Sequence, residues 1–87
     1  MWNIYIIKHN LTGDTYIGRT NNLERRLFEH NSGGQASTRR LNGQWNLVYA
    51  EIYRSKEDAV NRELKLKHHG RAKQELKKRI QNSIFEN

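Results

Sequence analysis

Two short runs with the alternation of β-strands, separated by a polar turn, most constrain what this chain can fold into. The runs span residues 2–9 and 15–19, and the turn Asn10–Asp14 carries Gly13 where a positive φ is expected. A loop this short predicts an antiparallel hairpin, in which directly opposite residues share a face. We therefore expect Tyr5, Tyr16 and Gly18 on one face, and Ile4, Ile6 and Ile17 on the other.

A short basic helix is expected directly after the hairpin, with Asn21 or Asn22 as its N-cap. On a helical wheel, His30 falls in the same apolar arc as Leu23, and Arg26 lies at the edge of that arc. Arg26 and His30 are an i, i+4 pair, so their side chains project from neighbouring positions. From the helix alone, His30 is either a core-edge histidine with one satisfied hydrogen bond or a functional group.

The next expected strand follows a polar loop, residues 31–43. This loop begins with the helix-ending run Ser32-Gly33-Gly34 and contains Ser37-Thr38-Arg39-Arg40. Hydroxyl and guanidinium groups suit contacts with phosphates, although a solvated loop would have the same composition. The strand is expected over residues 45–53, and strict alternation along it would place on one face Trp45, Leu47, Tyr49, Glu51 and Tyr53.

The second expected helix, residues 56–68, contains an acidic residue inside its apolar stripe. That stripe is formed by Ala59, Val60, Leu64 and Leu66. Glu63 falls near its middle and Lys67 falls beside it. A carboxylate in such a place is unfavourable unless it is paired or binds a metal. Glu63 is therefore either half of an ion pair, for example with Arg26 or Lys67, or a functional group.

Length and charge bound the class of protein. The 87 residues suit one domain, placed at residues 1–80, with a third basic helix over 71–80 after a break at Gly70 and a tail at 81–87. The net charge of +7 favours a polyanionic partner, above all DNA. The lack of cysteine excludes a disulfide framework and a thiolate metal site. With no long apolar run and no visible signal peptide, we expect a cytoplasmic protein without a membrane span.

Taken together, these segments resemble the GIY-YIG nuclease superfamily, most closely its small stand-alone bacterial members. The resemblance runs from about Trp2 to Lys78. It is carried by the ordered set Asn3-Ile4-Tyr5, Tyr16-Ile17-Gly18, Leu23 to Gly33, Ser37-Thr38-Arg39, Leu47-Val48-Tyr49 and Ala59 to Lys67. Either tripeptide alone would be a weak signal, but the set with its spacing kept is strong. It implies an α+β fold in which helices flank a three-stranded antiparallel sheet.

The resemblance also implies site residues and a cofactor. The catalytic positions would be Tyr5, Tyr16, Arg26, His30 and Glu63. Glu63 would bind a single divalent ion, Mg²⁺ or Mn²⁺, which keeps much of its water shell, and no small-molecule cofactor is expected. Contacts with nucleic acid are expected from Arg19, Arg25, Thr38, Arg39, Arg40 and Lys67. Gly18 matches the closing glycine of the second motif, where a side chain would crowd the site.

The function that follows is metal-dependent endonucleolytic cleavage of DNA phosphodiester bonds. The chain departs from the family pattern at two places. Asn3 stands where the first motif has glycine, and no position clearly matches the asparagine that several family nucleases carry after the metal-binding glutamate. Asn82 is the nearest candidate for it. The alternative is a non-catalytic nucleic-acid-binding module with a degenerate nuclease site.

Overall fold

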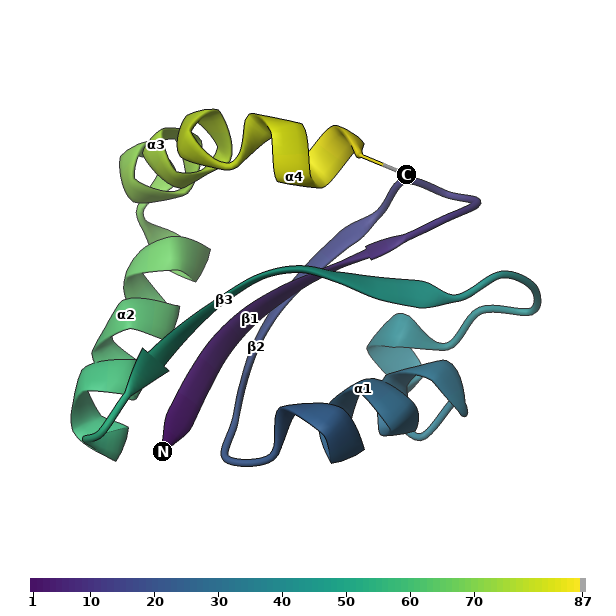
Figure 1. Cartoon of the computed structure of the whole chain (residues 1–87), viewed down its shortest axis with the longest axis horizontal. Helices are drawn as coiled ribbons and strands as arrows, with labels where there is room; N and C mark the ends of the chain where they lie inside the picture. The colour runs from purple at the N-terminus through teal and green to yellow at the C-terminus, as the bar shows by residue number, and fades with distance from the viewer. Residues whose placement is uncertain (87) are drawn as a thin grey trace.

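The computed structural model describes residues 1–86 and has the α+β architecture that the sequence predicts, with helices on both faces of a three-stranded antiparallel sheet (Figure 1). Asn87, the last residue of the expected tail, lies outside the described residues. The strands are β1 (Trp2–His9), β2 (Thr15–Thr20) and β3 (Trp45–Tyr53). The helices are α1 (Leu23–Asn31), the 3-10 turn η1 (Ala36–Thr38), α2 (Lys56–His68), α3 (Gly70–Arg79) and α4 (Gln81–Phe85).

Strand β1 is the centre of the sheet, whose order is β2-β1-β3. In the hairpin, Tyr5 lies opposite Gly18 and Ile7 lies opposite Tyr16, which confirms that Tyr5, Tyr16 and Gly18 share a face. Gly13 makes the predicted turn with φ at +76°, a backbone conformation that glycine adopts without strain. Because β2 pairs only with β1, its other edge is open.

A β-bulge in β3 overturns one expectation from the sequence. Ile6 pairs with Tyr49 but Ile7 pairs with Leu47, so Val48 is an extra residue in the ladder. The bulge sends Trp45 to the Tyr5 side of the sheet and Tyr49 to the opposite side. The prediction that Trp45, Leu47, Tyr49, Glu51 and Tyr53 all share one face is therefore wrong, because a bulge breaks the period of two.

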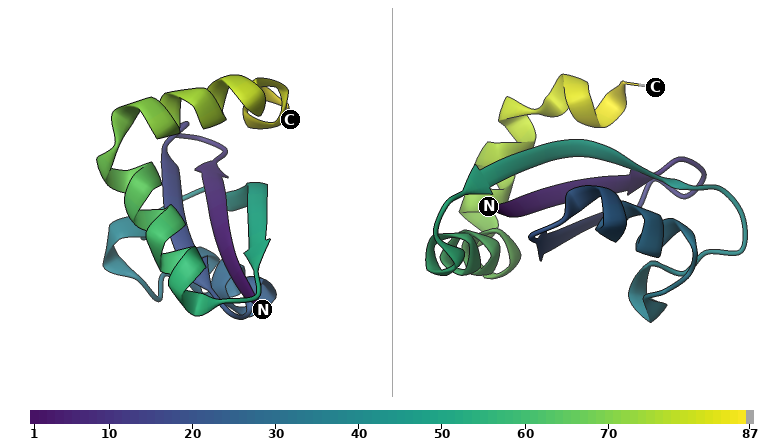
Figure 2. Two further views of the ribbon diagram at one scale, coloured as in Figure 1. Left: turned by 90° about the vertical axis from the view of Figure 1, so that its left-hand side faces the viewer. Right: turned by 60° about the horizontal axis from the view of Figure 1, so that its bottom comes forward.

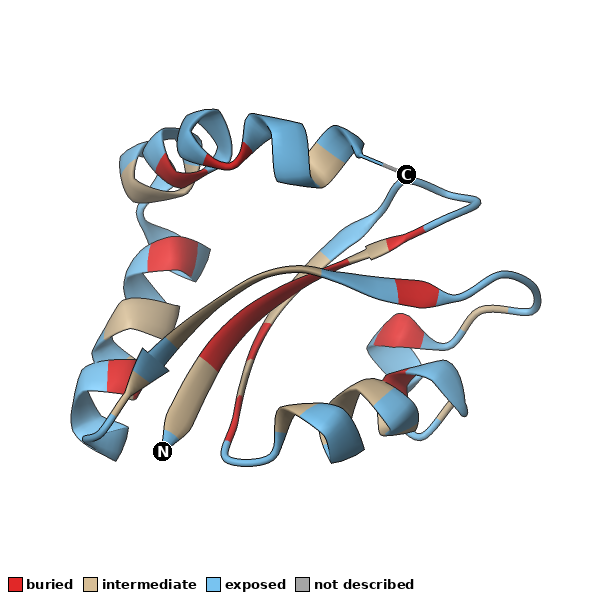
Figure 3. Cartoon of the chain, viewed as in Figure 1, coloured by how far each residue is buried: buried red, intermediate tan, exposed pale blue. Residues whose placement is uncertain are grey.

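The two faces of the sheet are covered by different layers (Figures 1 and 2). One face packs against α2, α3 and α4 through an apolar core that consists of Ile4, Ile6, Ala59, Leu66, Leu76 and Ile80. The other face carries Tyr5, Ile7 and Trp45 and packs against α1 and the segment that contains η1. Buried residues line the centre of β1 and the sheet-facing sides of the helices (Figure 3). We call these the helical layer and the site layer.

Helix α2 is oriented by one buried contact and one ion pair. Leu66 is fully buried, whereas Leu64 is 48% exposed, so the expected stripe was too wide on that side. Arg62 donates two hydrogen bonds from Nη2 and Nε to Glu51 of β3, at 2.9 Å each to Oε2 and Oε1. Glu51 also accepts from the hydroxyls of Tyr49 and Tyr53. These contacts fix the rotation of α2 and with it the direction of Glu63.

Local capping accounts for the ends of the helices. Asn22 caps α1, and its Oδ1 accepts from the backbone N–H of Arg25 at 3.1 Å, as the sequence predicts. Ser55 caps α2 in the same way through Asp58 at 3.4 Å. Within residues 1–86, no helix has both the length and the apolar content needed to cross a lipid bilayer. In the expected tail, Ile84 of α4 packs on the apolar core.

Candidate active site

A chain of hydrogen bonds joins the first strand to α1 and η1. The Tyr5 hydroxyl lies 2.7 Å from His30 Nε2, and His30 Nδ1 lies 2.7 Å from Thr38 Oγ1. All three side chains are buried, each about 1% exposed. His30 is therefore more than a core-edge histidine with one hydrogen bond, because both of its ring nitrogens are engaged.

The partners of Thr38 assign the tautomer of His30. The Thr38 hydroxyl donates to the carbonyl of Gln35 at 3.4 Å, so it receives the hydrogen bond from His30 Nδ1–H. Nε2 is then unprotonated and accepts from the Tyr5 hydroxyl. Burial and the nearby positive charge of Arg26 both lower the pKa of His30, which favours this neutral form.

Burial raises the pKa of Tyr5 to about 12. The Arg26 guanidinium opposes this shift, while Tyr16 and Glu63 add to it. Arg26 itself pairs with Glu29 across 3.4 Å on the same helix, and its side chain is 28% exposed. The structure thus brings Arg26 and Glu63 close enough to act electrostatically on the buried Tyr5 hydroxyl.

Tyr16 completes an aromatic cluster with Tyr5 and His30. Its ring centroid lies 6.4 Å from that of Tyr5 and 5.0 Å from that of His30. Its hydroxyl oxygen accepts a hydrogen bond from Gln35 Nε2 at 2.7 Å. Within residues 1–86 no side chain or carbonyl accepts the Tyr16 hydroxyl proton, so this proton can point toward a substrate.

Gly18 lies directly against Tyr5. A Cβ at position 18 would overlap the Tyr5 hydroxyl and the adjacent ring carbon. The backbone of Gly18 does not have a positive φ, so the requirement is for space rather than for an unusual conformation. This agrees with the expectation that a side chain here would crowd the site.

Glu63 is paired in the structure with two cations. Arg19 Nη1 lies 3.4 Å from its Oε1, and Lys67 Nζ lies 3.0 Å from its Oε2. The sequence suggested Arg26 or Lys67 as a partner; Lys67 is confirmed, and Arg19 takes the place of Arg26. The Lys67 ammonium also lies 5.7 Å from the centroid of the Tyr16 ring, which brings Glu63 and Tyr16 to one neighbourhood.

The donor set around Glu63 fits a hydrated hard cation. The described residues contain no group of three His, Cys, Asp or Glu side chains that could enclose a metal ion. The Glu63 side chain is 15% exposed and supplies one carboxylate. Mg²⁺ and Mn²⁺ are bound in this way, through one or two carboxylates and several waters. An ion at Glu63 would have to replace Arg19 or Lys67 at a carboxylate oxygen.

The expected nucleic-acid contacts differ in how accessible the structure leaves them. Arg19 and Lys67 are partly exposed and pair with Glu63, and Arg25 is exposed on α1. Thr38, however, is buried against His30, so its hydroxyl is not available to a phosphate, and we correct its expected role to that of positioning His30.

The two arginines of the η1 loop are held by the protein itself. Arg39 Nε donates to the carbonyl of Gly33 at 3.1 Å. Arg40 pairs with Asp14 at 3.0 Å, and its guanidinium lies 5.2 Å from the centroid of the Trp45 ring. Both contacts keep the η1 loop folded over the site layer.

Three residues of the site layer were not singled out as site residues by the sequence. Gln35 holds the Tyr16 hydroxyl, and Trp45 Nε1 donates to the carbonyl of Thr38 at 2.7 Å. Asn31 exchanges two hydrogen bonds with the backbone of Trp45, at 2.6 and 3.0 Å. Asn31 follows His30 directly in the sequence, but its hydrogen-bond partner Trp45 is fourteen residues away, so the sequence alone did not indicate its role.

Asn82, the candidate for the missing family asparagine, is exposed on α4.

Comparison with known proteins agrees with this fold and this arrangement of side chains. Residues 1–81 match the GIY-YIG catalytic domain family, and the chain belongs to that family. This is a nuclease family, and its nucleases generally use divalent metal ions. The resemblance inferred from the ordered motifs is thereby confirmed.

Relatives of this chain include bacterial proteins named UPF0213. One from Staphylococcus saprophyticus is 34% identical over 70 residues, which covers 80% of this chain and 84% of the relative. One from Clostridium perfringens is 41% identical over 64 residues, covering 74% of this chain and 68% of the relative. A UPF0213 protein from Bacillus halodurans, whose structure was solved by solution NMR, is 35% identical in sequence. The match covers 87% of this chain and 81% of that protein's chain, and the two structures superpose with a TM-score of 0.53.

Proposed function

We propose that this protein is an endonuclease that hydrolyses phosphodiester bonds of DNA with the help of a divalent metal ion at Glu63. The observation that carries the proposal is the buried chain from Tyr5 through His30 to Thr38. Membership of a nuclease family supports the reaction class. A cytoplasmic location and a role for the whole of residues 1–80 as one catalytic domain belong to the same proposal.

Tyr5 and His30 would act together as the general base. The Tyr5 hydroxyl proton points to His30 Nε2, so the Tyr5 oxygen can accept a proton from an attacking water while its own proton passes to His30. A tyrosine whose pKa is about 12 needs such an acceptor. The imidazolium that forms keeps its Nδ1–H bond to Thr38. As the water oxygen bonds to phosphorus, the opposite P–O bond breaks and the leaving oxygen takes a proton from solvent.

Negative charge on the phosphate would be stabilised by Arg26, by the Tyr16 hydroxyl and by a metal ion held at Glu63. The Arg26 guanidinium can donate to two phosphate oxygens in a fixed geometry. The free proton of the Tyr16 hydroxyl can serve the attacking water or a phosphate oxygen. Glu63 would hold hydrated Mg²⁺ or Mn²⁺, which when bound polarises a phosphate oxygen and stabilises the leaving oxygen.

One observation favours the alternative of a nucleic-acid-binding module without catalysis. Both oxygens of Glu63 are paired with cationic side chains, so the protein itself balances the charge of this carboxylate. Under this alternative Glu63 would be structural, and Arg19 and Lys67 would serve only to bind phosphates. The two functions predict different results for a substitution of Glu63.

The test is a cleavage assay on plasmid, branched and single-stranded DNA with Mg²⁺ or Mn²⁺, repeated with EDTA. We expect Glu63→Gln and Arg26→Ala each to lose at least about 100-fold in rate while DNA is still bound. The matched control is Glu75→Gln, because Glu75 also pairs with a cation four residues away but is 66% exposed on α3. It should cleave at the wild-type rate.

Failure to cut any substrate, with binding intact, would replace the nuclease by the binding module. Loss of folding in Glu63→Gln would instead give Glu63 a structural role, which circular dichroism and thermal unfolding would reveal. In that case Arg26→Ala still decides whether the site is catalytic, because the Arg26 side chain is 28% exposed and its salt bridge to Glu29 is an i, i+3 pair within one helix.

A further inference from the structure

A lysine-rich groove lies on the helical-layer side of the sheet and is not used by the reaction above. It has a volume of about 510 Å³ and is formed where the hairpin end of β1 and β2 meets α3 and α4. Its lining consists of Lys8, Gly13, Thr15, Lys77, Lys78, Gln81, Ile84 and Phe85. We call it the lysine groove. No Asp or Glu is among these residues.

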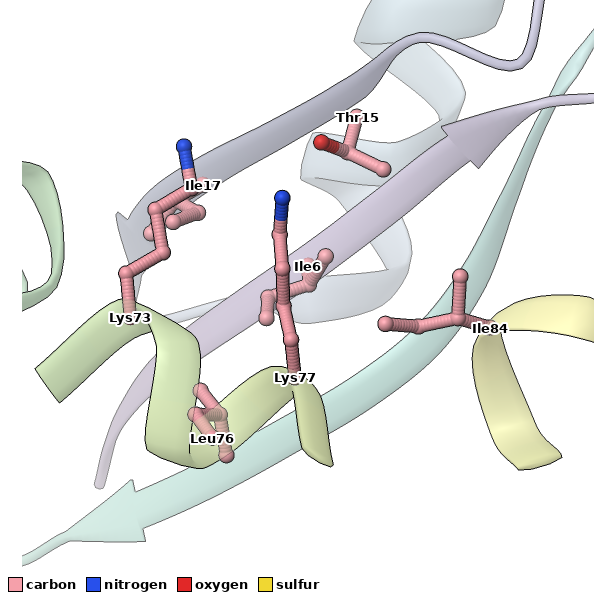
Figure 4. Close-up of a pocket in the computed structure, with 7 residues that line it drawn as sticks. All are labelled: Ile6, Thr15, Ile17, Lys73, Leu76, Lys77 and Ile84. Carbon is pink, nitrogen blue, oxygen red and sulfur yellow. The ribbon is translucent and has the colours of Figure 1, made fainter. Parts of the chain in front are cut away.

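The groove has an apolar floor with cationic side chains at its rim. It adjoins a recess in which Lys73 and Lys77 extend from α3 toward β2, above apolar residues of the helical layer (Figure 4). The apolar side chains of that recess are Ile6, Ile17, Leu76 and Ile84. Thr15, Lys77 and Ile84 line both spaces, so the two are continuous.

The positive charges of this surface are not neutralised by the protein. The described residues form six salt bridges, and none of these includes Lys8, Lys73, Lys77 or Lys78. Lys8 Nζ donates instead to the backbone carbonyl of Ile84 at 3.0 Å. Clustered cations without partners raise the local positive potential and attract a polyanion.

The groove and the candidate active site lie on opposite faces of the sheet and meet at the open edge of β2. Tyr16 points into the site, whereas its neighbours in the strand, Thr15 and Ile17, point to the other face and line the recess. A nucleic-acid strand that leaves the site would therefore pass around this edge to reach the groove. Lys67 sits 5.7 Å from the centroid of the Tyr16 ring, at the end of α2 next to α3. The ammonium groups of Lys67, Lys73 and Lys77 therefore follow β2 outward from the site.

An exposed aromatic ring is the last component of the surface. Phe85 is 70% exposed, and Lys8 Nζ lies 5.0 Å from the centroid of its ring. Basic grooves combined with accessible aromatic rings are how proteins hold single strands, because phosphates meet the cations and a base stacks on the ring.

We propose that the lysine groove binds a single-stranded nucleic-acid flank next to the phosphate that the site cleaves. This rests on the proposed function and names a substrate class for it: nucleic acid with a single-stranded extension rather than blunt duplex. An unpaired base can stack on the exposed Phe85 ring, whereas the bases of a blunt duplex are already stacked on one another. The backbone would run from Lys67 past Lys73 and Lys77, with a base on Phe85.

Fluorescence anisotropy in EDTA tests the proposal without any cleavage. The probes are a short single-stranded DNA, the corresponding blunt duplex, the same duplex with a single-stranded tail, and an RNA strand of the same sequence. Wild type should bind the tailed duplex and both single strands more tightly than the blunt duplex. In Lys73→Gln/Lys77→Gln, affinity for the single strands should fall at least roughly fivefold, and the salt slope should flatten by about 1.4, the loss of two phosphate contacts.

The matched control, Lys65→Gln/Arg71→Gln, removes the same number of charges. Lys65 is exposed on α2 beside Tyr53, and Arg71 is 91% exposed with Glu75 as its partner. This control should change single-strand affinity much less. Phe85→Leu should weaken binding several-fold with an unchanged salt slope, because it removes stacking but no charge.

Equal weakening by the two double variants would overturn the proposal and leave a general effect of net charge. Equal binding of blunt and tailed duplex by wild type would also overturn it. If the groove double variant proves unfolded by circular dichroism, Lys77→Gln alone gives the same readout with half the change in slope. Since no metal is present, either failure leaves the cleavage test intact, and a chain that never cuts can still bind in the groove.

Discussion

The site layer and the helical layer hold the same sheet by different means. On the site side, Tyr5, His30, Thr38 and Trp45 are joined by hydrogen bonds of 2.7 Å that fix direction as well as distance. On the helical side, Leu66 and Leu76 pack against Ile4 and Ile6 through aliphatic contacts that have no preferred direction. Apolar burial supplies most of the stability of a small domain, and the directional contacts place the groups that would carry out chemistry.

The helical layer also has a polar cluster, centred on Glu51. Burial alone would raise the pKa of Glu51, but hydrogen bonds from Arg62, Tyr49 and Tyr53 outweigh it and hold the pKa at about 2. This cluster joins α2 to β3 at the edge of the core and is structural. Polar burial is thus used on both sides of the sheet: on the helical side it holds α2 to β3 through Glu51 and Arg62, and on the site side it places the Tyr5 hydroxyl near Arg26.

The largest effect should come from the apolar contacts. Leu66→Ala should lower the free energy of unfolding by about 2–5 kcal/mol, because Leu66 is fully buried and its loss leaves a cavity. Leu64→Ala, on the same helix but 48% exposed, should cost less than about 1 kcal/mol. Urea unfolding measures both. Equal losses would mean that α2 is rotated from the position described here.

Acid should next loosen the helical layer through Glu51. Its folded pKa is lowered from 4.5 to about 2, so its contribution to stability is complete above pH 4.5 and is lost as the pH falls toward 2. The loss should be roughly 2–3 kcal/mol. Urea unfolding between pH 7 and pH 2 should show this slope in wild type and in Glu75→Gln but much less in Glu51→Gln. A parallel slope in all three proteins would exclude Glu51 as its source.

A smaller change in stability, with a complete loss of function, is expected at Gly18. Gly18→Ala places a methyl group against the Tyr5 hydroxyl and should displace the ring from His30, at a cost of about 1–3 kcal/mol. Gly70→Ala is the control, since a Cβ there meets no atom within 4 Å, and stability should change by no more than about 1 kcal/mol. Thermal unfolding and the cleavage assay give the two readouts. Normal cleavage by Gly18→Ala would show that Tyr5 need not contact His30.

The fold was predictable from the sequence wherever the determinants are local. Alternation along β1 and the turn at Gly13 predicted the hairpin and its shared face, and Asn22 marked the start of α1. Such signals act over a few residues, so one sequence is enough to read them.

The rest depends on contacts between distant residues. The bulge at Val48 belongs to the pairing of β3 with β1. No residue type within β3 indicates in advance where this bulge will form. Thr38 has the composition of a phosphate contact, yet it is buried because His30 and Trp45 close over it. For Glu63, the helical wheel indicated a partner on α1 or α2, whereas Arg19 reaches it from β2.

The position of Trp45 has a practical consequence. Its ring is 3% exposed, its indole N–H is bonded to Thr38, and the other tryptophan, Trp2, lies at the far end of β1 beside Arg19 and Lys56. Trp2→Phe would therefore leave Trp45, inside the site layer, as the single tryptophan of the chain. Its emission would shift to longer wavelength when η1 lifts away, so the chain carries an optical reporter for the half of the molecule where a substrate would arrive.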